Sequence, residues 1–126
     1  MTTWVRFKQG EAVKIGTLEG DTIAVYSGDM FNNPQPTGES VKLADVKLMT
    51  PCDPSKMILL WNNFFQLATK IAEKKGKEKP DIPLEPLWLL KPTNAYIADG
   101  DAVIRPNTYP GKVVYEGELG IVIGKR

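Results

Sequence analysis

Prolines and glycines divide this chain of 126 residues into short segments, and this division limits its fold more than any other feature. The sequence contains 10 prolines and 11 glycines. Proline lacks a backbone donor and glycine permits tight turns, so frequent breaks of both kinds favour short strands and turns over long helices. We therefore expect a mainly β fold of the α+β class.

The first half of the chain predicts a small antiparallel β unit. Apolar and polar side chains alternate in short runs, which is the pattern of a strand with one buried face. Turns at Gly10 and Gly20 separate the first three runs, which cover residues 4–8, 13–18 and 23–25. A meander of antiparallel strands is the expected result.

A domain boundary is predicted near residue 53. Residues 31–38 contain two prolines and predict a loop, because proline cannot donate to a sheet ladder. Residues 41–49 return to the β pattern, and two further prolines follow them. We therefore expect a small N-terminal β domain at residues 1–53 and a second domain at residues 54–126.

One buried strand and one helix are predicted after this boundary. Residues 57–61 form a continuous apolar run, which suits a strand buried on both faces. Apolar side chains then recur at helical spacing at Phe64, Leu67, Ala68 and Ile71. Asn63 is the expected N-cap of this helix, and Gly76 is its expected end. The nearby aromatic residues are expected to pack in the core rather than form a binding platform: Trp61, Phe64 and Phe65.

Two further strands are predicted in the last forty residues. Residues 87–90 are apolar, and Lys91 ends this run because a proline follows it. Residues 112–125 form the longest β pattern of the chain. A period of two places Glu116 and Glu118 together on one face of this strand.

Composition excludes several classes of function. The chain has no histidine, so it cannot build histidine-based acid–base catalysis or histidine-ligated zinc sites by itself. Its net charge of +1, without a basic block, gives no electrostatic surface for nucleic acid or an anionic membrane. Cys52, the one cysteine, cannot form an internal disulfide, and nothing at the N-terminus is typical of a signal peptide. We expect a cytoplasmic protein with no nucleic-acid partner and no membrane partner.

The pair Glu116 and Glu118 admits two interpretations. Side chains at i and i+2 on one face of a strand lie roughly 7 Å apart at the backbone, so two carboxylates can converge on one cation. Oxygen ligands in a chain without histidine favour a hard ion such as Mg²⁺ or Mn²⁺, with Ca²⁺ also suitable. The other interpretation is an amphipathic strand whose acids lie in water and pair with lysines across the sheet. Spacing alone leaves both open.

The segments around these residues resemble the fumarylacetoacetate hydrolase superfamily. The first matching segment is Leu89-Leu90-Lys91-Pro92-Thr93-Asn94-Ala95-Tyr96, followed by Gly100, Ile104 and Pro106. The second runs from Tyr115-Glu116-Gly117-Glu118 to Gly124-Lys125-Arg126. Order and spacing agree with the family in both. The N-terminal half is also similar to the small first domain of bacterial members, at Val5-Arg6-Phe7, Pro36-Thr37-Gly38, Val41-Lys42-Leu43 and Pro54-Ser55-Lys56.

The resemblance implies a mixed β-roll that encloses a divalent-metal site. It implies hydrolysis of a carbon–carbon bond, decarboxylation or isomerisation of small diketo or oxo dicarboxylic acids. Glu116 and Glu118 carry over as metal ligands, and Lys91 as a pocket lysine that meets a substrate carboxylate. The family resemblance also suggests a homodimer.

This chain departs from the family pattern in two ways, at its water-activating pair and at its third metal-binding carboxylate. Family members that catalyse hydrolysis or decarboxylation carry a histidine and, one helical turn later, an acidic residue, and this pair activates water. In this chain the matching residues are Leu67 and Lys70. Gln66 could hold a water but could not deprotonate it. The family's third metal-binding carboxylate lies in a later segment, so we expect a longer protein or a complementing chain to complete the site. A non-catalytic structural or partner-binding module that keeps the family fold is the alternative.

Overall fold

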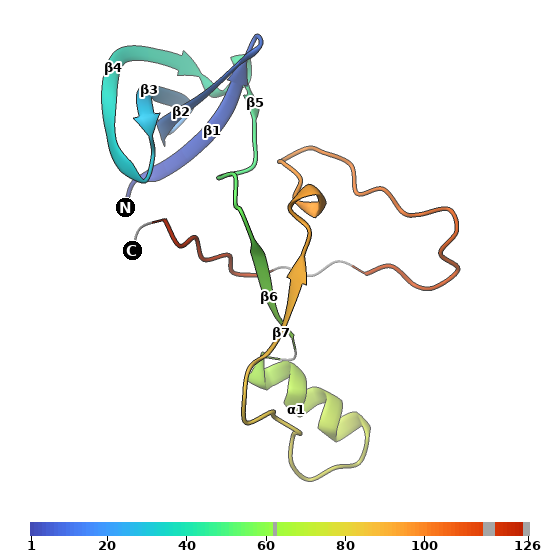
Figure 1. The fold of residues 1–126 in the computed structure, drawn as a ribbon. Helices are drawn as coiled ribbons and strands as arrows, with labels where there is room; N and C mark the ends of the chain where they lie inside the picture. Colours follow the sequence, from blue (N-terminus) through green and yellow to red (C-terminus); the bar gives the residue numbers. More distant parts are fainter. Residues whose placement is uncertain (62, 115–117, 125–126) are drawn as a thin grey trace. The chain divides into compact units, whose positions relative to one another are not determined.

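The computed structural model describes residues 1–61, 63–114 and 118–124. The chain divides into two compact units, one formed by Met1–Asp53 with Ile97–Arg126 and the other by Pro54–Tyr96. The first unit carries a five-stranded sheet, and the second carries a two-stranded sheet and the helix α1 (Figure 1). The predicted mainly β, α+β fold is confirmed. The domain boundary after residue 53 stays a prediction.

The five-stranded sheet is an antiparallel meander with the order β4-β3-β2-β1-β5. Its strands are β1 (Thr3–Gln9), β2 (Ala12–Glu19), β3 (Thr22–Asp29), β4 (Asn32–Lys42) and β5 (Lys47–Leu48). The short helix η1 (Leu43–Asp45) joins the last two strands. The first three strands lie where the alternating pattern predicts them.

Glycine makes the first two hairpin turns possible. Gln9 pairs with Ala12, so only Gly10 and Glu11 form the turn between β1 and β2. Gly10 has φ +59°, a conformation that glycine adopts without a Cβ penalty and that a type II′ turn requires at its first central position. Both turns predicted from glycine are therefore confirmed, since Gly20 has φ +60° at the equivalent position.

The predicted loop at residues 31–38 is wrong, because most of this segment belongs to β4. Among the described strands β4 lies at the edge and pairs with β3 alone, so a proline there can leave its missing donor on the outer side without interrupting a ladder. Pro36 lies opposite Tyr26 in the register. The pairing shifts register twice along β3, between Ala24 and Tyr26 and between Ser27 and Asp29. Such irregularities bend an edge strand and accommodate the prolines.

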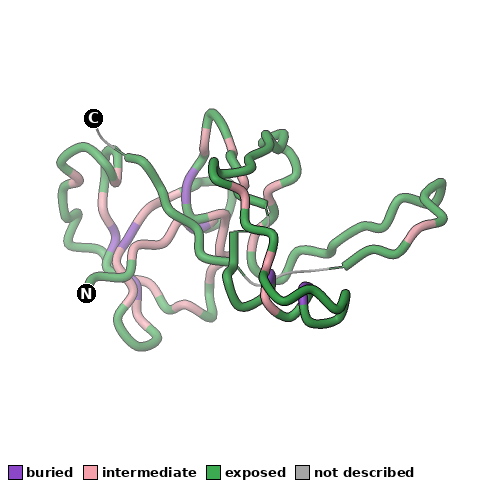
Figure 2. The backbone as a smooth tube through the Cα atoms, turned by 90° about the horizontal axis from the view of Figure 1, so that it is seen from below, coloured by how far each residue is buried: buried purple, intermediate pink, exposed green. Residues whose placement is uncertain are grey.

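The core of the first unit lies on one face of this sheet. Phe7, Ile23 and Val25 are buried there, and Figure 2 shows how few residues of the chain are buried in this way. Partly buried apolar residues surround them: Val5, Leu18, Val41, Leu43, Val46 and Leu48. Elsewhere on the sheet, the rings of Trp4 and Tyr26 meet edge to face with their centroids 4.9 Å apart.

The second sheet pairs β6 (Met57–Trp61) with β7 (Leu87–Lys91) in antiparallel register. Both strands occur where the sequence predicts them. The expected burial of β6 on both faces is wrong, since Ile58 is 62% and Trp61 66% exposed. Burial of both faces requires a layer packed on each face. The described residues of the Pro54–Tyr96 unit supply no such layers for β6, and β7 is exposed along its whole length.

The N-cap of the helix α1 (Phe65–Lys74) comes later than predicted, and the helix ends before Gly76 as predicted. Phe64 occupies the N-cap position without a side-chain hydrogen bond, so the expected cap at Asn63 is wrong. At the other end Gly76 has φ +66° and its amide donates to the Glu73 carbonyl at 3.0 Å. The Lys77 amide donates to the Ala72 carbonyl at 2.9 Å, which completes a Schellman motif.

The apolar stripe of α1 is only partly covered. Ala68 and Ala72 are buried, whereas the larger side chains of Leu67 and Ile71 remain exposed. The expected core packing of three aromatic residues is wrong as well, because all are exposed: Trp61, Phe64 and Phe65. Small residues can be buried against a nearby loop, but large side chains need a packing layer, and the described part of this unit does not provide one.

The segment before the C-terminus is not a strand over the residues described. Residues 112–114 and 118–124 belong to no helix or strand, and all of them are exposed. The predicted strand at 112–125 is wrong for these residues, since an alternating pattern forms a strand only where a neighbour completes its hydrogen bonds. No helix in the described parts of the chain has the length and apolar character needed to cross a membrane.

Candidate metal and substrate site

The two predicted metal ligands differ in how far the structure describes them. Glu118 lies in an exposed segment without regular secondary structure, where a hydrated ion can reach its carboxylate. Glu116 lies outside the described residues. Among the residues that are described, no group of three or more acidic or cysteine side chains could hold a metal ion. A carboxylate pair suits a hard divalent ion, which takes about six oxygen ligands, so Glu116 and Glu118 would be part of a larger set. Their role stays a prediction.

Lys91 is the last residue of β7 and lies opposite Met57 in the register. It is exposed, and Pro92 ends the ladder directly after it. The chain then turns into the short helix η2 (Thr93–Ala95), where the Ala95 amide donates to the Pro92 carbonyl at 3.0 Å. The Lys91 ammonium therefore stands at the end of a strand. Lys91 and Glu118 belong to different units.

A shallow hollow of about 330 Å³ lies beside the first turns of α1. Its lining residues are Phe64, Phe65, Gln66, Leu67 and Lys70. Leu67 and Lys70 are the residues that match the family's water-activating pair, and both border this hollow. Leucine has no proton acceptor, and a lysine ammonium only donates. The described residues that line the hollow thus include no group that could deprotonate water.

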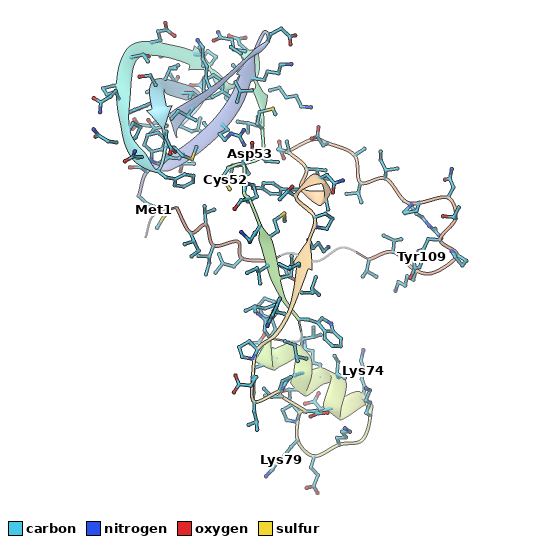
Figure 3. The ribbon with its side chains drawn as sticks, in the orientation of Figure 1. Met1, Cys52, Asp53, Lys74, Lys79 and Tyr109 are labelled. Atoms are coloured by element: carbon cyan, nitrogen blue, oxygen red, sulfur yellow. The ribbon has the colours of Figure 1, made fainter. Side chains whose placement is uncertain are left out.

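The lysine-rich end of α1 faces solvent. Lys74 and Lys79 are exposed, and Figure 3 shows their side chains pointing away from the helix and the loop that follows it. The Lys74 side chain lies in the last turn, where a cation suits the helix dipole. The lysine-rich end of α1 is therefore a solvated helix end.

Asp101 makes a contact that no sequence pattern indicated. Its carboxylate accepts a hydrogen bond from Lys47 Nζ on β5 at 2.8 Å and another from the Ala98 amide at 3.0 Å. The partners Lys47 and Asp101 are 54 residues apart in the chain. Alternation patterns report local structure only, so they could not indicate a contact between residues this far apart in the chain. The contact attaches the segment leading toward Glu118 to the five-stranded sheet.

The Asp101 contact predicts a pH dependence of stability. Lys47 and then the Ala98 amide hold the pKa of Asp101 below its usual value of 3.8. Because the folded pKa is lower than the unfolded pKa, the contact stabilises the fold above about pH 4 and its contribution is lost as pH falls further. Asp101→Asn should therefore lower the melting temperature at pH 7, and the difference from wild type should shrink toward pH 3. Asp99→Asn, in the same turn, is the control. A difference that stays constant with pH would contradict the ion pair.

Models of two protein families match the chain. The fumarylacetoacetate (FAA) hydrolase C-terminal model matches residues 56–126, and the Rv2993c-like N-terminal model matches residues 2–51. The first match covers more than half of the chain and contains Lys91, Glu116 and Glu118.

Several proteins are similar to the chain. Protein Rv2993c of Mycobacterium tuberculosis is 40% identical over 96 residues, which are 75% of this chain and 33% of that protein. The mitochondrial oxaloacetate decarboxylase of Dictyostelium discoideum is 34% identical over 71 residues, 56% of this chain and 29% of that protein. The crystal structure of 5-carboxymethyl-2-hydroxymuconate delta-isomerase from Mycobacterium smegmatis is 30% identical with a TM-score of 0.59, covering 77% of this chain and 35% of that chain. The chain thus spans about a third of the length of these relatives.

Proposed function

The chain belongs to the fumarylacetoacetate hydrolase family, and from this premise we propose that it contributes to a divalent-metal-dependent enzyme acting on small oxo acids. One observation carries the proposal. The family match at residues 56–126 includes both the Lys91-Pro92 segment and the Glu116-Gly117-Glu118 segment, in the order and spacing of the family.

Glu116 and Glu118 are proposed to hold the metal ion. Carboxylate oxygens suit Mg²⁺ or Mn²⁺, and Ca²⁺ is a further possibility for such a donor set. When bound, the ion supplies Lewis-acid stabilisation of negative charge on substrate oxygens. Two glutamates supply only part of its coordination, so further oxygens from solvent, substrate or other protein segments are required.

Lys91 is proposed to bind the carboxylate of the substrate. An ammonium at the exposed end of a strand is accessible to a small anion, and it can donate up to three hydrogen bonds. This interaction would hold the carboxylate end of an oxo acid and leave its remaining oxygens free to meet the ion.

Isomerisation or decarboxylation is the proposed reaction class, rather than hydrolysis. Hydrolysis needs a base that activates water, and the lining of the hollow on α1 contains Leu67 and Lys70 at the positions of the family pair. Decarboxylating members of the family also carry that pair, so decarboxylation by this chain would rely on the metal ion and Lys91 instead. Two similar proteins are named a delta-isomerase and a decarboxylase, and these names support isomerisation or decarboxylation over hydrolysis.

A non-catalytic module that keeps the family fold is the second candidate. The missing water-activating pair favours it, since a chain that only binds a partner has no need of that pair. In either case we propose a second chain, as a homodimer or a complementing subunit.

The test of the metal site is a calorimetric titration with Mn²⁺. Wild type should bind one ion, and Glu116→Ala/Glu118→Ala should bind it at least about tenfold more weakly because both ligand carboxylates are lost. Glu78→Ala/Glu85→Ala also removes two negative charges, but from residues outside the motif, and is the matched control. Equally weak binding by wild type and the motif variant would reject the proposal of a metal-dependent enzyme and leave the non-catalytic module as the remaining candidate.

A further inference from the structure

One side of the helix α1 carries apolar and basic side chains together. Residues spaced i, i+3, i+4 and i+7 line one side of a helix. The α1 residues in this series are Leu67, Lys70, Ile71 and Lys74. Leu67 is 46% and Ile71 38% exposed, and both lysines are exposed as well. Glu73, the one acidic residue of α1, lies outside the series, so this stripe carries positive charge only.

The stripe continues into the shallow hollow of about 330 Å³ beside the first turns of α1. Leu67 and Lys70 belong to the stripe and also line the hollow, together with Phe64 and Phe65. Both phenylalanine side chains are exposed. A contiguous group of large exposed apolar side chains is typical of an interaction surface. We refer to the stripe and these two phenylalanines as the α1 surface.

The lysines of the α1 surface form no ion pair with any described residue. The lysines that do form ion pairs with described residues all belong to the first unit: Lys8, Lys14, Lys42 and Lys47. Lys70 and Lys74 lie one helical turn apart, where two like charges repel each other. A carboxylate that approaches between them is attracted by both, and Figure 3 shows the Lys74 side chain pointing away from the helix.

We propose that the α1 surface binds an acidic amphipathic helix of another polypeptide. The apolar side chains of that helix pack on Leu67 and Ile71 and enter the hollow, and its carboxylates pair with Lys70 and Lys74. The occupant is a helix because rows of side chains spaced by three and four residues pack between the rows of a second helix. The proposal is independent of the metal site, since none of these residues belongs to it.

Charge and shape select this occupant over two others. A second copy of the chain would bring its own Lys70 and Lys74 against the same lysines, and like charges across an interface are unfavourable. An anionic membrane would satisfy the charge, but it binds a broad apolar face and gains nothing from a hollow. A partner helix supplies both the negative charge and a side chain that fits the hollow.

A designed peptide is the probe, because it carries only the chemistry that the proposal requires. It has leucine at the spacing i, i+3, i+4 and i+7, glutamate at the other positions and a fluorescein label. Fluorescence polarisation should show saturable binding to the full chain, and this binding should weaken as NaCl is added. The same peptide with glutamine in place of glutamate should bind about fivefold more weakly, since exposed ion pairs contribute modestly.

Three variants separate the contributions of charge and apolar contact. Lys70→Gln/Lys74→Gln should weaken binding of the acidic peptide about fivefold. Leu67→Ala should weaken binding of both peptides about fivefold, because it removes apolar area at the contact. Lys56→Gln/Lys112→Gln removes two exposed lysines outside the α1 surface and is the matched control. If the control loses as much affinity as Lys70→Gln/Lys74→Gln, net charge alone attracts the peptide and the proposal is wrong.

A second measurement uses the wild-type chain, so it does not depend on how the variants fold. In ¹H–¹⁵N correlation spectra the acidic peptide should shift the amide signals of residues 64–74 more than those of the five-stranded sheet. Largest shifts in the sheet, or no saturable binding, would overturn the proposal. So would a dimer that Leu67→Ala dissociates in sedimentation velocity, which assigns the surface to a second copy. Cosedimentation with phosphatidylserine vesicles without peptide binding would assign it to a membrane instead.

Discussion

Gly16→Val is expected to disrupt the five-stranded sheet. Gly16 is buried in the middle of β2, opposite Val25 on β3. A Cβ at this position would lie 2.5 Å from the Ala24 carbonyl oxygen and 2.5 Å from Cγ2 of Ile23. The first of these atoms is backbone, so β3 would have to move away from β2. Overpacking of this kind costs on the order of 3 kcal/mol, which is a large part of the stability of a small domain.

Urea unfolding followed by far-UV circular dichroism measures this effect. The transition of the sheet should shift to much lower urea concentration or be absent. Gly120→Ala is the matched control, since a Cβ at this glycine would have no atom within 4 Å and its φ is not in the left-handed region. The prediction fails if Gly16→Val and Gly120→Ala unfold at the same urea concentration.

Phe7→Ala is the second change with a large expected effect. Phe7 is fully buried and packs with Ile23 and Val25 at the centre of the core. Removing a buried aromatic ring leaves a cavity in addition to the lost burial and costs roughly 3–5 kcal/mol. A unit with so few buried residues has little other apolar contact to compensate, so most of the population should be unfolded at room temperature.

Two further variants separate cavity formation from a general loss of hydrophobicity. Phe7→Leu keeps most of the apolar volume and should cost much less than Phe7→Ala. Val13→Ala truncates a side chain on β2 that is half exposed, and its unfolding midpoint should stay close to that of wild type. The one-dimensional NMR spectrum reports the outcome through its upfield methyl signals. Well-dispersed methyl signals in Phe7→Ala would mean that another cluster stabilises the sheet.

Local patterns in the sequence predicted most of the elements. Alternation located β1, β2 and β3, because each has one face on the core. The helical spacing located α1, and Gly76 marked its end because only glycine adopts φ +66° there at little cost. These features depend on residues close in sequence, which is why composition and spacing sufficed.

Features that depend on distant neighbours could not be predicted in this way. The prolines of β4 indicated a loop, yet they are tolerated because β4 has a partner on one side only. The apolar character of β6 indicated burial, but burial depends on which layers the rest of the protein supplies. For the same reason the pattern at residues 112–125 did not form a strand in the residues that are described.

The residues of the candidate site also divide into those that short sequence motifs indicate and those that only the structure reveals. Glu118 and Lys91 were identified from short motifs, and the match at residues 56–126 supports the family from which their roles were inferred. The ion pair of Lys47 with Asp101 involves no motif, so only the structure revealed it. The role of the glutamates stays a prediction that the Mn²⁺ titration tests, and the role of Lys91 stays a prediction.

The strand order of the first sheet has a consequence for folding during synthesis. Apart from the pairing of β1 with β5, each strand pairs with its neighbour in sequence, so the sheet can form from local contacts as soon as Leu48 leaves the ribosome. β6 must instead wait for β7, which is translated only after α1 and the proline-rich loop. Until then the nascent chain carries an unpaired apolar strand, and this interval is when a chaperone would be needed most.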